Sequence, residues 1–368
     1  MNTLRLIFFV YLIILTSGTA LAEDTDLSLE LLINNLNNYF QAYYSQLTKG
    51  GVINPKTEVL EDIKEIAFNY TKIDNKLLSH ADSPDELSTI FDDYLRDYGK
   101  SIVLFTVGDS EIVNCWLGNL IEEKVETKNV WNREIQYTLR VLGELAIQDF
   151  TYFSSGGKDA LDAGTRSGFI YYNLDAYRSR AASIWDFFAQ KDKKKRRYDP
   201  SKSNRLRKKL YNKTWLNLYT GCIKDSPNLE EAKKRFIDKA VIALKENSLC
   251  HEAGHIFADR YLKLNDEVKE EMLAFLSELR YGPLPYESLE TIIAASYKSS
   301  MVSYNLAGRQ IIAEFLSFIR NEQKNGNPDY KDINIQGRNQ IEKINNLYKL
   351  SGIEIRAISE YIYEQKRN

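Results

Sequence analysis

Two of the chain's three histidines stand four positions apart, in the run His251-Glu252-Ala253-Gly254-His255. On an α-helix, residues i and i+4 project from the same face, so this spacing lets both imidazoles reach one ion. Glu252 lies about 100° further round the helix, where its carboxylate can address a water on that ion without binding the ion. The segment is therefore predicted to be a helix that presents a metal site. Two ordinary helical histidines are the alternative.

This motif resembles that of the zincin metallopeptidases, over roughly residues 248–281, which is under a tenth of the chain. The resemblance implies that His251 and His255 bind Zn²⁺ and that Glu252 is the general base and acid. The metzincin branch continues with a glycine and a third histidine, but Ala258 and Tyr261 stand at those positions. That branch is therefore excluded.

A second helix downstream offers a carboxylate as the third ligand. Asp266 and its neighbours give a helix start signal, and Gly282-Pro283 gives a stop signal. Glu271, with the small residue Ala274 three positions on, resembles the gluzincin arrangement, in which a glutamate from the next helix completes the site. The spacing departs from that of the best-known gluzincins. The third ligand is thus expected to be Glu271, and two further glutamates remain alternatives: Glu270 and Glu278.

The remaining metal-binding side chains are not expected to reach the ion. His80 lies far upstream beside a Ser-Pro turn. Cys250 adjoins His251, but neighbouring side chains on a helix point about 100° apart, which favours a buried structural thiol. Cys115 and Cys222 complete the set of three cysteines. So few cysteines exclude a disulfide scaffold, and either one bridge with one thiol or three buried thiols is consistent with the sequence.

A zinc peptidase commonly has one further donor that stabilises the oxyanion formed when water adds to the scissile carbonyl. Tyr304 is preferred, because the small pair Ala307-Gly308 follows it and lets helices approach closely. The other residues that could serve are Tyr281, Tyr286, Tyr297, Arg280 and Arg309.

The first 22 residues have the layout of a cleavable secretory signal. One cation, Arg5, precedes the apolar run 6–15, and small residues stand at 19–22 just before an acidic residue. The apolar run is short for a membrane span. A retained membrane anchor is the alternative. The mature protein is therefore expected to be secreted or periplasmic.

Helical periodicity dominates the mature chain, beginning with Leu29, Leu32 and Leu36. It predicts helices near 56–70, 85–98, 110–126 and 129–150. Two short apolar runs rich in β-branched and aromatic residues are predicted to be strands, at 101–107 and 168–174, and the second is expected to be the edge strand that pairs with an extended substrate. The predicted fold is mainly α, an α+β arrangement with a small sheet.

The expected organisation is a signal peptide at 1–22, an N-terminal helical lobe with the small sheet at 23–190, a basic linker at 191–209 and a zincin-like catalytic lobe at 210–368. The linker holds eleven Lys or Arg residues against two Asp residues. It is either a contact for anionic lipid, polysaccharide or an acidic partner, or a solvated linker.

The whole chain is close to neutral, with 49 basic against 51 acidic side chains. Net charge therefore gives no reason to expect nucleic acid as a partner, and the sequence does not indicate an oligomeric state. The function expected from the motif is a zinc metallopeptidase whose partner is a peptide or protein substrate. Two rivals stay open: an exported helical binding protein with a catalytically silent zinc site, and a zinc hydrolase acting on something other than a peptide.

Overall fold

The computed structural model describes residues 24–50, 54–106, 111–150, 163–166, 168–189, 202–298, 301–335 and 340–367. Contacts divide the chain into two compact units, Met1–Ser83 and Pro84–Asn368. The predicted signal peptide at 1–22 lies outside the described residues. None of the described helices combines the length and the apolar character needed to cross a bilayer.

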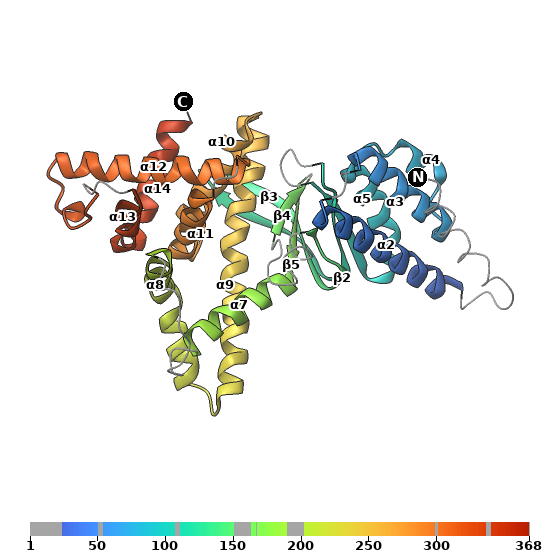
Figure 1. The fold of residues 1–368 in the computed structure, drawn as a ribbon, viewed down its shortest axis with the longest axis horizontal. Coiled ribbons are helices and arrows are strands. Elements are labelled where there is room, and N and C mark those ends of the chain that lie inside the picture. Colours follow the sequence, from blue (N-terminus) through green and yellow to red (C-terminus); the bar gives the residue numbers. More distant parts are fainter. Residues whose placement is uncertain are drawn as a thin grey trace. The chain divides into compact units, whose positions relative to one another are not determined.

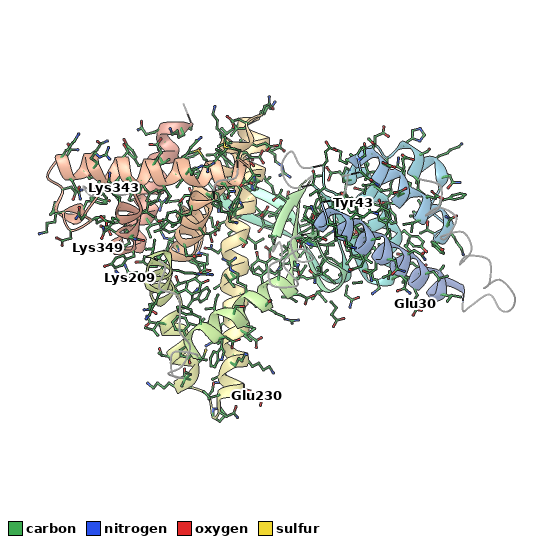
Figure 2. The ribbon with its side chains drawn as sticks, in the orientation of Figure 1. Glu30, Tyr43, Lys209, Glu230, Lys343 and Lys349 are labelled. Atoms are coloured by element: carbon green, nitrogen blue, oxygen red, sulfur yellow. The ribbon has the colours of Figure 1, made fainter. Side chains whose placement is uncertain are left out.

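The first unit is made of the helices α2 (Asp24–Thr48), α3 (Lys56–Tyr70) and α4 (Asn75–His80) (Figure 1). The apolar stripe of α2 faces inward, so Tyr43 is buried whereas Glu30 on the other face is exposed (Figure 2). The side chains that fill the contact between α2 and α3 are Leu32, Leu36, Phe40, Val59, Ile63 and Ala67.

The second unit contains a five-stranded sheet in the order β1-β2-β3-β5-β4. Neighbouring strands are antiparallel except β3 and β5, which are parallel. The strands are β1 (Lys100–Phe105), β2 (Asn114–Val130), β3 (Arg133–Ile147), β4 (Ala163–Arg166) and β5 (Phe169–Asn173). The fold is mainly helical with one small sheet in the described residues, as the sequence predicted.

The helices predicted at 110–126 and 129–150 are wrong, because these residues form the long strands β2 and β3. The charged side chains of β2 alternate rather than follow a helical face. Lys124 pairs with Glu122 and Glu126 at 2.8 and 2.7 Å, which are residues two positions away on the same face of a strand. In β3, Ile135, Tyr137, Leu139 and Val141 are buried at every second position.

The two predicted strands at 101–107 and 168–174 are confirmed as β1 and β5. The second is not an edge strand, however, because β5 pairs with β3 on one side and with β4 on the other. The outer strand at this end of the described sheet is β4, which contacts α9.

Helices of the second unit pack against the sheet, and those from residue 174 onward share one continuous hydrophobic core with it. The helices are α5 (Pro84–Leu95), α7 (Leu174–Ala189), α8 (Lys202–Lys224), α9 (Leu229–Phe257), α10 (Glu267–Tyr281), α11 (Pro285–Tyr297), α12 (Ser303–Lys324), α13 (Gln340–Asn345) and α14 (Gly352–Lys366). Helices α7 and α9 both contact the strands. Of the basic linker predicted at 191–209, residues 202–209 begin α8 and residues 191–201 lie outside the described residues, so the lobe boundary expected there stays a prediction.

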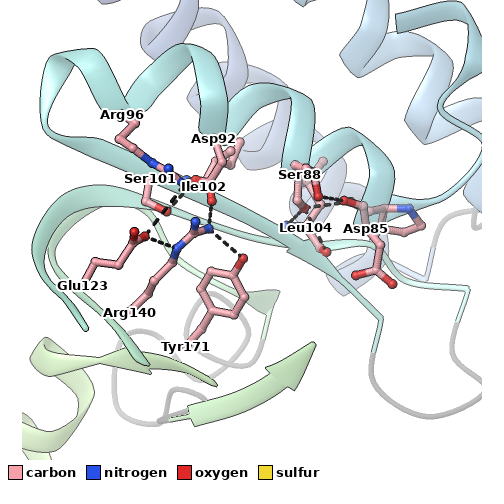
Figure 3. Close-up of polar contacts among 12 residues, drawn as sticks. Asp85, Ser88, Asp92, Arg96, Ser101, Ile102, Leu104, Glu123, Arg140 and Tyr171 are labelled. Atoms are coloured by element: carbon pink, nitrogen blue, oxygen red, sulfur yellow. Dashed lines mark hydrogen bonds and ion pairs between the residues drawn. The ribbon is translucent and has the colours of Figure 1, made fainter. Parts of the chain in front are cut away.

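Helix α5 is fastened to the sheet by a buried ion cluster (Figure 3). Arg140 on β3 pairs with Asp92 on α5 and, through Nε, with Glu123 on β2 at 2.5 Å. Its Nη1 also donates to the Tyr171 hydroxyl at 3.2 Å. Asp92 in turn accepts a hydrogen bond from Ser101. Each acidic group of this cluster has a basic partner from the chain itself.

The tip of the β2–β3 hairpin docks onto the later helices. Trp131 and Asn132 take positive φ angles of 51° and 61°, which the tight turn between two antiparallel strands requires. The Trp131 indole donates to Ser277 Oγ on α10 at 2.8 Å, and its ring stacks on Tyr363 of α14 with centroids 3.7 Å apart. The sheet therefore helps to fix the position of α10.

Candidate metal centre

The predicted motif helix is the C-terminal part of α9, and the predicted second helix is α10. Asp266 caps α10 by accepting from the backbone N–H groups of Val268 and Lys269, and the helix ends at Gly282, as the sequence predicted. The two helices meet closely at Gly254. A methyl group added there would lie 2.7 Å from the Cα of Ala274. Only glycine permits this approach, which brings the acidic face of α10 up to the histidines.

Three donor atoms converge between the two helices. The Nε2 atoms of His251 and His255 lie 3.2 Å apart, and Glu271 Oε2 lies 3.7 Å from the first and 3.9 Å from the second. These separations are close to the ligand–ligand distance of about 3.4 Å in a tetrahedral zinc site. The three atoms are therefore close enough together for one cation to bind all of them. The structure thus brings together the three residues that the sequence proposed as ligands.

Glu271 provides the test of whether these residues fit a cation. Its Oε2 atom is buried and has no hydrogen-bond partner among the described residues. A buried carboxylate oxygen without a donor is costly, because burial removes the water that would otherwise solvate the charge. A divalent cation between the imidazoles would satisfy this oxygen, so the residues present fit the metal.

The two alternative ligands contact the far sides of the imidazole rings. Glu270 Oε1 lies 2.9 Å from His255 Nδ1, and Glu278 Oε2 lies 3.3 Å from His251 Nδ1. A carboxylate on Nδ1 fixes the tautomer and the ring orientation, so that Nε2 keeps its lone pair for a metal. Glu270 therefore orients the His255 ring by a hydrogen bond, whereas Glu278 contacts His251 Nδ1 without one, and Glu271 alone of the three faces both Nε2 atoms.

Glu278 is itself held in place by two other helices. Its Oε1 atom accepts hydrogen bonds from Asn247 on α9 and from Ser288 on α11, the second at 3.0 Å. The Asn247 side chain also accepts from the Leu284 N–H at 3.0 Å, at the start of α11. Sequence patterns did not single out Asn247 or Ser288; the only local signal is that Asn247 lies one helical turn before His251.

The electrostatics of the site favour positive charge at the imidazoles. Burial by itself lowers the pKa of His251, but the carboxylates of Glu278, Glu252 and Glu271 outweigh burial and raise the pKa to about 9. The pKa of His255 is also raised, because its hydrogen bond to Glu270 and the charge of Glu271 together exceed the effect of burial. A metal that binds here must displace any proton from the two Nε2 atoms.

Glu252 is buried beside the cluster, with 7% of its surface exposed. Its Oε2 atom accepts a hydrogen bond of 2.5 Å from Thr165 Oγ1, which belongs to the outer strand β4. One donor from the sheet therefore restrains the carboxylate that the sequence proposed as the base. Sequence patterns did not point to Thr165, since it lies 87 positions upstream of its partner.

Of the residues proposed to stabilise an oxyanion, Tyr304 is linked to the histidines through one aromatic ring. Phe275 packs edge-on against His251 with ring centroids 5.1 Å apart, and the Tyr304 ring lies 4.8 Å from Phe275. Tyr304 stands in the first turn of α12.

The other proposed oxyanion donors have contacts elsewhere. The Tyr281 hydroxyl accepts from the Trp131 N–H, and Arg280 pairs with Glu360 at 2.9 Å. Arg309 donates to the Lys298 carbonyl. Two further tyrosines are on α11: Tyr286 lies beneath the Lys213 ammonium, and Tyr297 is 40% exposed.

The cysteines and His80 take no part in the cluster. Cys115, Cys222 and Cys250 are three buried thiols, which decides between the two alternatives left by the sequence. Burial raises the pKa of Cys250 to about 12, as expected of a structural thiol. His80 belongs to the first unit, where its Nδ1 contacts the Lys76 carbonyl.

No family model, curated protein or solved structure matches this chain. Its function has to be inferred from the geometry of the site.

Proposed function

We propose that this protein is an exported zinc-dependent metallopeptidase, secreted or periplasmic, that hydrolyses peptide bonds with water. The observation that carries the proposal is the buried, unpartnered Glu271 Oε2, which lies 3.7 and 3.9 Å from the Nε2 atoms of His251 and His255. These are three protein ligands of the types that catalytic zinc sites use, and such sites keep a fourth position for water or substrate. A structural zinc site more often has four protein ligands and needs no base.

The residues divide the chemistry between them. His251, His255 and Glu271 would hold Zn²⁺, which when bound polarises a carbonyl and lowers the pKa of water. Glu252 accepts the proton of the attacking water and returns it to the leaving amine. Thr165 fixes one oxygen of Glu252 by its 2.5 Å hydrogen bond, which leaves the other oxygen for the water.

Two more elements suit a peptide substrate. Strand β4 contacts α9 and carries Thr165, so an extended peptide that pairs with β4 would run past Glu252. Tyr304, which packs on Phe275 beside His251, is the phenol that we propose as donor to an oxyanion. Export is supported by the signal-like residues 1–22.

The test is metal analysis of the purified protein followed by digestion of a mixed peptide library. We expect about one zinc per chain and cleavage that a chelator abolishes and added zinc restores. The matched control is Glu252→Gln, which preserves the size and the Thr165 contact; it should retain zinc but cleave nothing. Thr165→Val should keep zinc and lower kcat by about a hundredfold, since the base loses its restraint.

Each contrary result selects a different explanation. Zinc binding without cleavage of any peptide would support an exported helical binding protein with a silent metal site. Hydrolysis of small esters or amides without peptide cleavage would support a zinc hydrolase with another substrate. If Glu271→Ala binds zinc as tightly as the wild type, Glu271 is not the third ligand.

A further inference from the structure

Positive charge in this chain is concentrated in one segment. Residues 191–209 carry a net charge of +9, with eleven Lys or Arg residues against two Asp residues, although the whole chain carries −2. The rest of the chain therefore carries −11. Like charges this close along the chain repel one another, and binding to a polyanion lowers that repulsive energy. The described part of the segment, 202–209, forms the beginning of α8.

Lys209, at the end of this segment, and two lysines outside it lie around one tyrosine. Lys209 lies over the Tyr348 ring, with Nζ 3.6 Å from the centroid. The pKa of Tyr348 is lowered, first by contact with Lys209 and then by the charges of Lys349 and Lys213. We call Lys209, Lys213 and Lys349 the lysine patch; Figure 2 labels the first and the last on neighbouring elements.

Within the described residues, the lysine patch lacks an acidic partner. All three side chains are exposed, and none forms an ion pair with a described acidic side chain. Lys213 and Lys349 use some of their N–H groups on main-chain carbonyls, those of Leu350 and Asp332, which fixes the stems and leaves the charge unneutralised. By contrast Arg207, on the same helix, is paired with Glu290.

The geometry points to the surface of an anionic phospholipid bilayer as the partner of the lysine patch. Lysine ammonium groups act as separate point charges, which suit a plane of headgroup phosphates better than bidentate recognition of one phosphate. The phenol rings of Tyr348 and Tyr286 lie directly beneath Lys209 and Lys213 and have the amphipathic character found at membrane interfaces. The acidic remainder of the chain is repelled by such a surface, which orients the protein with this patch toward it.

Cosedimentation of the full mature chain with lipid vesicles tests this proposal. We expect binding to vesicles that contain phosphatidylglycerol, little binding to pure phosphatidylcholine, and release at high salt. Replacing Lys209, Lys213 and Lys349 together by Gln should lower the partition coefficient by about a hundredfold at low ionic strength. A matched control replaces three exposed, unpaired lysines elsewhere by Gln, at Lys234, Lys239 and Lys324, and should bind nearly as the wild type does.

Three results would overturn the proposal. Equal binding to phosphatidylglycerol and pure phosphatidylcholine vesicles would show that the net negative charge of the bilayer is not recognised. An equal loss in the control triple would show that only total charge matters. Binding to soluble dextran sulfate without binding to vesicles would assign the patch to a polyanionic polymer. Circular dichroism of both triple variants shows whether they are folded, so that misfolding is not mistaken for any of these outcomes. The experiment does not depend on the proposed zinc site.

Discussion

The second unit holds two clusters of carboxylates, and only in one of them does every described carboxylate have an arginine partner. In the cluster under α5, Arg140 lies between Asp92 and Glu123, and Arg96 approaches Glu123 at 3.8 Å. Between α9 and α10, four glutamates surround two imidazoles, and one carboxylate oxygen has no described partner. In the first cluster each carboxylate has an arginine partner, whereas the second has only the two imidazoles against its glutamates. The difference supports our proposal that a divalent cation binds in the second.

Arg140→Met should give the largest loss of stability. The substitution leaves the Asp92 carboxylate buried beside β1 without its guanidinium partner. Breaking such a pair typically lowers the free energy of unfolding by about 3–5 kcal/mol. Chemical denaturation with and without zinc measures the effect. The loss should be the same in both conditions; a loss that zinc reverses would mean that the two clusters are not independent.

Zinc itself should stabilise the protein by about 2.7 kcal/mol when its free concentration is a hundred times Kd, because the folded site binds it and the unfolded chain does not. A thermal shift on adding zinc to chelator-treated protein reports this. Glu271→Gln should remove most of the shift and Glu290→Gln, at a carboxylate paired with Arg207, should keep it. Equal shifts in the two variants would contradict the assignment of the site.

Glu278→Gln should weaken zinc binding by about ten- to a hundredfold, since it removes the charge beside His251 Nδ1. Competition with a chromophoric chelator gives the affinity. Glu270→Gln should have a similar but smaller effect, because Glu270 is more exposed than Glu278. If Glu270→Gln abolishes binding while Glu271→Gln does not, these two glutamates have exchanged roles.

Trp131→Phe should have the smallest effect. The phenyl ring keeps the stacking on Tyr363 but cannot donate to Ser277, and the lost hydrogen bond is worth about 1 kcal/mol of unfolding free energy. Urea denaturation measures the change. Tyr363→Leu, which removes the stacked ring, is the companion variant. If neither substitution changes the free energy of unfolding, the tip of the β2–β3 hairpin does not stabilise the position of α10.

Local signals were sufficient for α9 and α10. The cap at Asp266, the stop at Gly282 and the four-residue histidine spacing each concern neighbours within a turn or two, and the structure has both helices where these signals predicted them. The close approach at Ala274 also followed from its size. The sequence alone could not decide among Glu270, Glu271 and Glu278. That choice depends on how closely α10 approaches α9, and Gly254 sets that distance.

Long-range pairing explains what the sequence did not reveal. The charged residues Glu122, Lys124 and Glu126 are compatible with the exposed face of a helix in the sequence. Only pairing with β3 shows that their alternation belongs to a strand. Thr165 had no local signal, since its importance depends entirely on Glu252.

The separation of Thr165 from Glu252 by 87 residues has a consequence for folding. The proposed ligands span only residues 251–271, so the α9–α10 pair can close around a metal ion early, with little loss of chain entropy. The hydrogen bond to the base forms only when β4 has joined the sheet and docked on α9. On the function proposed above, the metal ligands would therefore come together before the hydrogen bond that restrains Glu252 has formed.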